Sequence, residues 1–377
     1  MHSHQFHYQA GVWHPALPEN SQAQWVLVFG SRRAMADEAI NGALGAAFPK
    51  GHVMGSTTSG EILGERIFDE SLVVTAVEFG HSRIASHSVD LVDYPNLAAA
   101  AEALVAHLPV PGLKHVMVFS DGQQVNGTTL VDSLVQNLPA DVLITGGLAA
   151  DDDRFAETVV WHNDRVAAGK IVICGFYGTA LKIGHGCFGG WDTFGADRLI
   201  TKAKGNVLYE LDHLSALELY KKYLGELAGQ LPGAALRIPL SVRLPGASES
   251  VVRTILNTDE VNQTMIFAGD MPEGASARLM RANPSRLIDG AQDAAKFALQ
   301  GLDGSAPQLA LLISGVGRRL VLKQETEAEL EAIHEVFTDG CQLCGFYSYG
   351  EIAPLLDSQV CTLRNQPMTI TTFYERS

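Results

Sequence analysis

Two acidic side chains occupy matching places in two short stretches of the chain. Glu61 and Glu351 each stand in a Gly-Glu-Ile sequence whose glycine follows an earlier glycine, Gly55 or Gly345, at the same offset of five residues. Two carboxyl groups held near each other can act as general acid and general base. A carboxylate in a turn can also serve structurally, by accepting hydrogen bonds from backbone N–H groups. We favour the structural interpretation and keep the catalytic one as the alternative.

A single Cys-x-x-Cys pair, Cys341 and Cys344, resembles half of a redox or metal site. The chain has no second pair to complete such a site, and Cys344 lies in an apolar run, which favours buried core positions. The sequence also lacks a Walker-type phosphate loop, a His-Glu-x-x-His motif and a Gly-x-Ser-x-Gly motif. The nucleophile-based enzyme classes therefore have no motif support.

Two of the thirteen histidines have sequence surroundings that suit an iron ligand. His185 lies in a Gly-rich turn beside Cys187, and His213 precedes an expected helix. An axial haem ligand needs a neutral imidazole in an apolar pocket, and either residue is a candidate for that role. The alternative for each is a plain surface or core position. There is no Cys-x-x-Cys-His motif for covalent attachment of haem.

The glycine-rich turns are the best candidates for a ligand pocket. The stretch Thr145-Gly146-Gly147 is a looser counterpart of the two stretches that carry the glutamates. Glycine lets a backbone approach a ligand closely, and the free N–H groups of such turns suit anionic groups. The alternative is that these are ordinary tight turns. The expected pocket residues are Gly55, Ser56, Thr57, Gly146, Gly147, Phe346, Tyr347 and Tyr349.

These stretches belong to three copies of one repeated unit. Each copy begins with an apolar strand ending at Phe29, Phe119 or Ile313, and continues with an amphipathic helix, a second apolar strand and a β-hairpin. Each copy has a marker glycine in its second apolar strand, namely Gly55, Gly146 or Gly345. From the end of the first strand to this marker glycine the spacing is 26, 27 and 32 residues. The hairpins are expected at residues 72–79 with 82–91, 157–162 with 165–176 around Asn163-Asp164, and 360–363 with 368–374. Residues 1–23, with His2, His4 and His7, are expected to be a flexible, solvated lead-in.

The repeated unit predicts the fold class. A strand, a helix and a second strand form a right-handed parallel crossover. Strands with apolar side chains at successive positions need cover on both faces. The fold class is therefore α/β, with mixed β-sheets covered by helices and built from repeated strand-helix-strand-hairpin units. In such sheets ligands bind where the carboxyl ends of strands meet the loops, and the glycine-rich turns lie there.

Length and composition set the number of domains and exclude some partners. With 377 residues, 46% of them hydrophobic, the chain is expected to form two domains. A net charge of −15, with no basic block longer than a pair such as Arg318-Arg319, argues against nucleic acid and anionic membranes as partners. No apolar run is long enough to span a bilayer, and the N-terminus lacks a secretory signal pattern. Five cysteines, an odd number, fit a cytoplasmic protein without a disulfide framework.

The repeated stretches also carry a resemblance to a known family. Residues 55–62, 145–152 and 345–352 resemble the FIST family, and so do residues 189–195, 204–211 and 315–322. This is a family of bacterial sensory domains with N-terminal and C-terminal parts, which the resemblance places at residues 24–212 and 213–374. Residues 267–270 and 279–291 are similar to the stand-alone members of the family that sense nitric oxide.

The resemblance implies a cytoplasmic sensor that holds non-covalent haem b, binds nitric oxide and controls a partner histidine kinase in cyclic-di-GMP and biofilm signalling. It assigns no iron ligand, so His185 and His213 are candidates from their sequence surroundings alone. Two alternatives stay open. One is a sensor of an amino acid or another small metabolite without haem, and the other is an enzyme that uses Glu61 or Glu351. A homo-oligomer is compatible with each of these.

Overall fold

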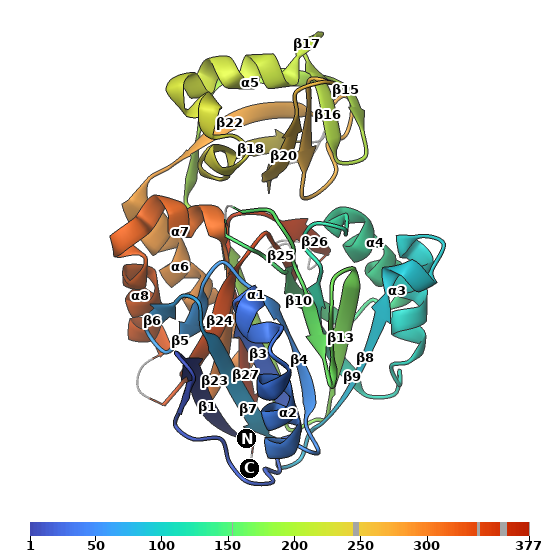
Figure 1. Ribbon diagram of the computed structural model, residues 1–377, viewed down its shortest axis with the longest axis vertical. Helices are drawn as coiled ribbons and strands as arrows, with labels where there is room; N and C mark the ends of the chain where they lie inside the picture. The colour runs from blue at the N-terminus through green and yellow to red at the C-terminus, as the bar shows by residue number, and fades with distance from the viewer. Residues whose placement is uncertain (153, 244–248, 338–339, 355–359, 377) are drawn as a thin grey trace.

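A computed structural model describes all residues except 153, 244–248, 338–339, 355–359 and 377. The described part contains eight α-helices and four β-sheets. Three sheets form a large core, and the fourth belongs to a lobe that sits on one end of this core (Figure 1). The predicted α/β class, with mixed sheets covered by helices, is confirmed.

The core contains three strand-helix-strand units, and the two strands of each unit pair in parallel. The helices begin where side chains cap them: Asp37 and Asn126 both accept hydrogen bonds from N–H groups of the first turn. The three copies predicted from the sequence are thus confirmed. They are β3 (Trp25–Gly30), α2 (Glu38–Ala47) and β4 (His52–Thr57); β9 (Leu113–Ser120), α4 (Gly127–Asn137) and β10 (Leu143–Leu148); and β23 (Leu309–Gly315), α8 (Glu327–Phe337) and β24 (Gln342–Ser348).

Each unit continues into a short hairpin that joins the sheet of another unit. The hairpin of the first unit pairs with β24 of the third, that of the second pairs with β4 of the first, and that of the third pairs with β10 of the second. The three units therefore exchange hairpins in a closed cycle. The hairpins are β5 (Glu61–Leu63) with β6 (Arg66–Phe68), β11 (Val160–His162) with β12 (Arg165–Ala167), and β25 (Gly350–Pro354) with β26 (Cys361–Arg364).

After its hairpin each unit places one strand beside its own first strand, and the first two units each send a further strand to the edge of another sheet. The strands beside the first strands are β7 (Leu72–Glu78), β13 (Lys170–Tyr177) and β27 (Met368–Glu375). The edge strands are β8 (Arg83–Asp90), which pairs with β13, and β14 (Leu181–Phe188), which pairs with β27. The sheet of the first unit receives β1 (His2–Gln9) in this place, followed by β2 (Val12–His14).

Three local predictions from the sequence were wrong, and one was right. Residues 72–79 and 82–91 do not form a hairpin, because β7 and β8 lie in different sheets, and neither do β26 and β27. A buried strand such as β7, covered on both faces, needs partners on both edges, and it finds β3 and β1 there. The N-terminal residues are not a lead-in but this β1 partner. The hairpin around Asn163-Asp164 is confirmed in β11 and β12.

The two ends of the chain meet at the end of the core farthest from the lobe (Figure 1). The amino group of Met1 lies 3.1 Å from a carboxylate oxygen of Glu375, and the same carboxylate accepts N–H bonds from Gly80, His81 and Ser82. Although burial opposes ionisation, these donors lower the pKa of Glu375 to about 2. Strand β1 therefore begins where β27 ends, and it occupies the place that a further strand after β27 would take.

The three sheets face one another around a common apolar centre. The rings of Phe29 and Phe119, from equivalent strands, lie 5.4 Å apart, and that of Phe346 lies 4.6 and 5.8 Å from them. Such aromatic clusters add specific ring contacts to the burial of large apolar area. The outer faces of the sheets are covered by α2, by α3 (Leu97–Ala106) with α4, and by α6 (Pro284–Ala298) with α8.

The lobe is inserted between β14 and α6 of the core. It has its own apolar cluster between the sheet and α5 (Ala216–Leu224), which includes Tyr220, Met265 and Phe267. It is fastened to the core by Asp270, which binds Asn126 (2.6 Å), and by Arg253, which donates to the carbonyl of Leu363 (3.2 Å). Its strands are β15 (Trp191–Lys204), β16 (Val207–Leu211), β17 (Leu214–Ser215), β18 (Leu240–Arg243), β19 (Val251–Arg253), β20 (Ile255–Asp259), β21 (Thr264–Phe267) and β22 (Ser276–Ala282). The remaining short helices of the chain are α1 (Arg32–Met35) and α7 (Val316–Leu322).

Candidate functional site

The marker glycines lie inside strands, where neighbouring backbone crowds them. A Cβ atom on Gly55, Gly146 or Gly345 would stand 1.7, 1.9 or 1.8 Å from a carbonyl oxygen of the first strand of the same unit. No side chain fits at these distances, so glycine is required for the parallel strand pair itself. The repeated glycine therefore has a packing reason in all three units.

The other residues expected to line a pocket are buried at the same end of the strands. Ser56, Gly147 and Phe346 hold equivalent positions, and the Phe346 ring fills the centre of the core. Thr57 accepts the N–H of Val159 through its hydroxyl oxygen. The hydroxyl of Tyr347 donates to Glu329 (2.6 Å), and that of Tyr349 donates to the carbonyl of Asp152 (3.0 Å). The eight predicted residues are thus all buried, and none of them is among the residues that line the cavity described next.

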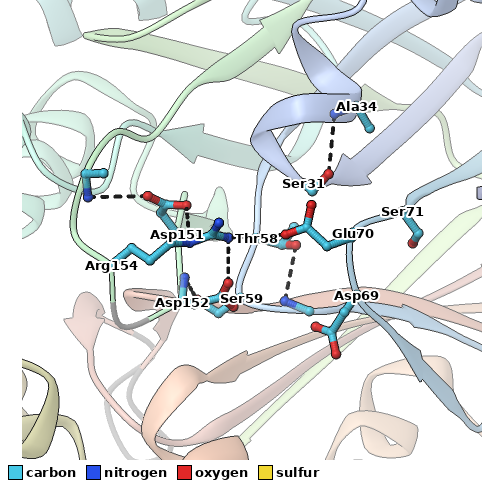
Figure 2. A network of polar contacts seen from close by, with 12 residues as sticks. Ser31, Ala34, Thr58, Ser59, Asp69, Glu70, Ser71, Asp151, Asp152 and Arg154 are labelled. Atoms are coloured by element: carbon cyan, nitrogen blue, oxygen red, sulfur yellow. Dashed lines mark hydrogen bonds and ion pairs between the residues drawn. The ribbon is translucent and has the colours of Figure 1, made fainter.

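A cavity of about 500 Å³ opens where the carboxyl ends of the core strands meet the lobe. All three units and the lobe contribute to its wall: the turn before β5, the loops after β6 and β10, helix α7, and a short 3-10 helix of the lobe at Gly233–Arg237. Part of this wall is seen in Figure 2. The lining residues are Ser31, Thr58, Ser59, Gly60, Glu61, Asp69, Glu70, Asp152, Arg154, Arg237, Val316, Arg319, Leu320 and Lys323.

Glu61 is the most deeply buried acid of this cavity. Its two carboxyl oxygens accept hydrogen bonds from the hydroxyls of Thr58 (2.5 Å) and Ser71 (2.7 Å). Burial raises the pKa of Glu61 to about 8, against the lowering effect of these two hydroxyls. Near neutral pH the side chain therefore keeps its proton. The donors are hydroxyls and not the backbone N–H groups that a simple turn would supply.

The loop after β10 brings an arginine and two aspartates to one side of the cavity (Figure 2). Arg154 pairs with Asp152 at 2.7 Å and with Asp151 at 3.3 Å, and it lies 3.7 Å from Glu70 of the first unit. The backbone N–H of Asp152 donates to the hydroxyl of Ser59 (2.7 Å). Half of the Arg154 side chain is exposed, so its charge also faces the solvent of the cavity.

Helix α7 supplies a second arginine. Arg319 donates to the carbonyl of Ser59 (2.6 Å) and to the carboxylate of Asp69 (2.5 Å), and its guanidinium lies 5.8 Å above the ring of Tyr347. The neighbouring Arg318 is fully buried and pairs with Glu329 at 2.8 Å. The two consecutive residues therefore face opposite ways, one toward the cavity and one into the core.

The third arginine comes from the lobe. Arg237 ends the 3-10 helix Gly233–Arg237, and its side chain lines the cavity. Its buried Nε atom has no hydrogen-bond partner among the described residues, and no described acid pairs with its guanidinium. Arg237 differs in this from Arg154 and Arg319, which both have acidic partners.

The remaining candidates lie elsewhere. His185, in β14, has its ring 6.4 Å from that of Phe297, and burial lowers its pKa. His213 is exposed in the lobe. Glu351, the counterpart of Glu61, is fully buried, accepts the hydroxyl of Ser348 (2.6 Å) and has a pKa well above its usual value because of burial. In the described part of the chain, no three or more His, Cys, Asp or Glu residues gather as metal ligands would. All five cysteines are buried and free, as expected for Cys341 and Cys344.

Sequence reasoning missed the arginines of the cavity. Arg319 does follow the strand end Ser314-Gly315 of the third unit, in the position where loops of such sheets carry ligand residues, and this was the available signal. Arg154 and Arg237 had no such signal. They come together only because the hairpin exchange and the lobe bring distant segments to one end of the core.

Comparison with known proteins agrees with this architecture. Residues 24–214 match the FIST N domain and residues 216–354 match the FIST C domain, so the chain belongs to the FIST family. FIST domains are sensor domains of signal transduction that bind small ligands. The boundary between the two matched parts falls inside the lobe, between β16 and α5.

No curated protein matches the chain. Among solved structures, a crystal structure of cyanuric acid hydrolase from A. caulinodans aligns with 78% of this chain and 100% of its own, at 10% identity and a TM-score of 0.20. That likeness is too remote to support an inference. No helix in the described residues has the length and apolar character to cross a membrane.

Proposed function

We propose that this protein is a sensor that binds a small charged metabolite, such as an amino acid, in the cavity between the core and the lobe. The observation that carries the proposal is the mixed charge of the wall. Four cationic side chains, Arg154, Arg237, Arg319 and Lys323, face four acids, of which Glu61 keeps its proton near neutral pH. In a chain of net charge −15, this local balance favours a ligand with an acidic group.

The size and position of the cavity support the same proposal. About 500 Å³ lies within the range of small-molecule sites, and the carboxyl ends of strands are where such sheets bind ligands. A ligand held here contacts all three units and the lobe at once. The proposal includes no catalytic turnover: both oxygens of Glu61 are engaged by hydroxyls, and Glu351 is not among the lining residues.

Haem-based nitric oxide sensing, which the family resemblance implies, is the alternative proposal. Burial keeps the imidazole of His185 neutral, as an axial ligand requires. However, neither His185 nor His213 is among the residues that line the cavity between the core and the lobe, and an apolar pocket beside α5 measures only about 20 Å³. The described residues thus fit a haem poorly, and we place the metabolite sensor first.

We further propose that the bound state is passed by contact to a cytoplasmic signalling partner, such as a histidine kinase. The net charge of −15 suits a partner with a basic face. A pull-down of a co-expressed histidine kinase in 150 mM and 500 mM salt tests this contact. Loss of the kinase at high salt is expected, because a charge-complementary interface is screened. Retention in both buffers contradicts a charge-based contact.

The central experiment is a thermal-unfolding screen of the purified protein against the twenty amino acids and small carboxylates. A ligand at 100 times its Kd stabilises the protein by about 2.7 kcal/mol, which raises the unfolding temperature measurably. Arg154→Gln should weaken this effect, whereas Lys296→Gln, which removes an ion pair from the exposed face of α6, should not.

Reconstitution with haem tests the alternative proposal. If no compound raises the unfolding temperature, and the protein reconstituted with haem shows a stoichiometric Soret band that shifts with nitric oxide, the metabolite sensor is refuted and the haem sensor is supported. His185→Ala and His213→Ala then locate the iron. No Soret band on reconstitution refutes the haem sensor instead.

A further inference from the structure

Arg237 stands at the contact between the lobe and helix α7. The residue before it, Leu236, is fully buried and packs in one cluster with Val316, and its carbonyl oxygen would lie 2.1 Å from a Cβ atom on Gly317. The backbone of the lobe therefore touches α7 closely at this point. Because Leu236 is fixed there, the next residue must project into the cavity.

The free guanidinium of Arg237 is suited to an oxyanion. Arginine offers a planar fork of N–H donors that matches carboxylate and phosphate oxygens in a bidentate way. A buried donor without an acceptor costs free energy, and an anionic ligand would remove that cost at Arg237. Arg154 and Arg319 already have acidic partners, whereas Arg237 has none among the described residues and, unlike the exposed Lys323, carries a buried donor atom.

Helix α7 also binds the two segments of the chain that connect the core to the lobe. Arg318 donates to the carbonyls of Gly189 (2.8 Å) and Leu287 (2.7 Å). Gly189 lies just before the first strand of the lobe, and Leu287 lies just after its last strand, at the start of α6. The helix that carries Arg319 on the cavity wall therefore also binds, through Arg318, both segments that connect the lobe to the core.

We propose that the oxyanion group of the metabolite binds Arg237 beside the contact between Leu236 and α7 and thereby stabilises that contact, so that occupancy of the cavity sets the position of the lobe. The inference rests on the proposed function for the identity of the metabolite, but not for the anion site itself. Its chemistry is that of a carboxylate or phosphate group. The lobe, not the core, is then the part of the molecule that reports the bound state.

Hydrogen exchange of the full chain tests the inference, with inorganic phosphate as the probe and sodium chloride of equal ionic strength as the reference. Phosphate at ten times its Kd should slow exchange in residues 233–237 and 316–322 about tenfold, because opening of this contact then requires loss of the anion. Arg237→Gln should abolish the protection. Arg281→Gln, which removes an exposed arginine of the lobe outside the cavity, should keep it.

Two results overturn the inference. One is the absence of phosphate protection in the wild type, and the other is equal protection in Arg237→Gln. The metabolite screen separates this failure from failure of the proposed function. A compound that stabilises wild type and Arg237→Gln equally leaves the sensor standing and removes the role of Arg237. Phosphate protection that depends on Arg237, with no stabilising metabolite, supports the anion site and refutes the metabolite sensor.

Discussion

Replacing Glu61 by glutamine tests whether this carboxyl keeps its proton in the folded protein. The amide oxygen and the NH2 group of glutamine can bond the hydroxyls of Thr58 and Ser71 as a protonated carboxyl does. The substitution is therefore expected to leave the fold intact and to remove one titrating group. Glu351, which has the same kind of shift, stays in both proteins and cancels in the comparison.

The direction and size of the effect follow from the pKa. The folded value of about 8 exceeds the ordinary value of 4.5, so between these values the folded state binds the extra proton and stability falls as pH rises. For these two values the loss from pH 5 to pH 8 is about 3–4 kcal/mol. Glu61→Gln should lack this loss, so its advantage over wild type should grow by that amount across the interval.

Urea unfolding at pH 5, 6.5 and 8, followed by tryptophan fluorescence, measures the difference. Glu226→Gln, an exposed position on the lobe, serves as the control and should follow the wild type at every pH. A difference between Glu61→Gln and wild type that stays constant from pH 5 to pH 8 would refute the reasoning. It would mean that Glu61 ionises alike in the folded and unfolded states.

Three further substitutions test the packing that positions the cavity, each by urea unfolding. Arg318→Met leaves the buried carboxylate of Glu329 without its cation and should cost about 3–5 kcal/mol, most of which Arg318→Met with Glu329→Met should recover. Gly345→Ala places a Cβ atom against the Leu312 carbonyl and should cost about 3 kcal/mol or more, whereas Gly45→Ala, with open space around it in α2, should cost nothing. Phe346→Ala empties the centre of the core and should cost about 3–5 kcal/mol. Smaller losses would contradict the packing described.

The sequence predicted the repeated unit well because each unit is local. An apolar run, a helical stripe and a marker glycine lie within about thirty residues, and the glycine has one steric reason at all three places. The hairpin around Asn163-Asp164 was predictable from its turn residues for the same reason.

The partners of the strands were not predictable, because they depend on distant segments. Nothing in the composition of β5 or β25 indicates that they pair with β24 and β10 of other units. Likewise, β7 and β8 read as a hairpin, since a short polar link separates them, yet they enter different sheets. The same holds for the cavity. The sequence predicted a ligand site near the turn after Gly55, but Arg154 and Arg237 come to this cavity only through tertiary structure.

The cyclic exchange of hairpins has a consequence for how the chain can be divided. The segment 24–214 includes β5, but its partner β24 lies beyond residue 340, and β10 would lose β25 as its neighbour. Such a fragment would expose unpaired strand edges, which invite aggregation. Joining the ends near Met1 and Glu375 and opening the chain elsewhere would, by contrast, preserve every strand pair. The two regions that match the FIST N and FIST C domains are thus parts of one interlocked structure, in which all three units are needed to pair the exchanged strands.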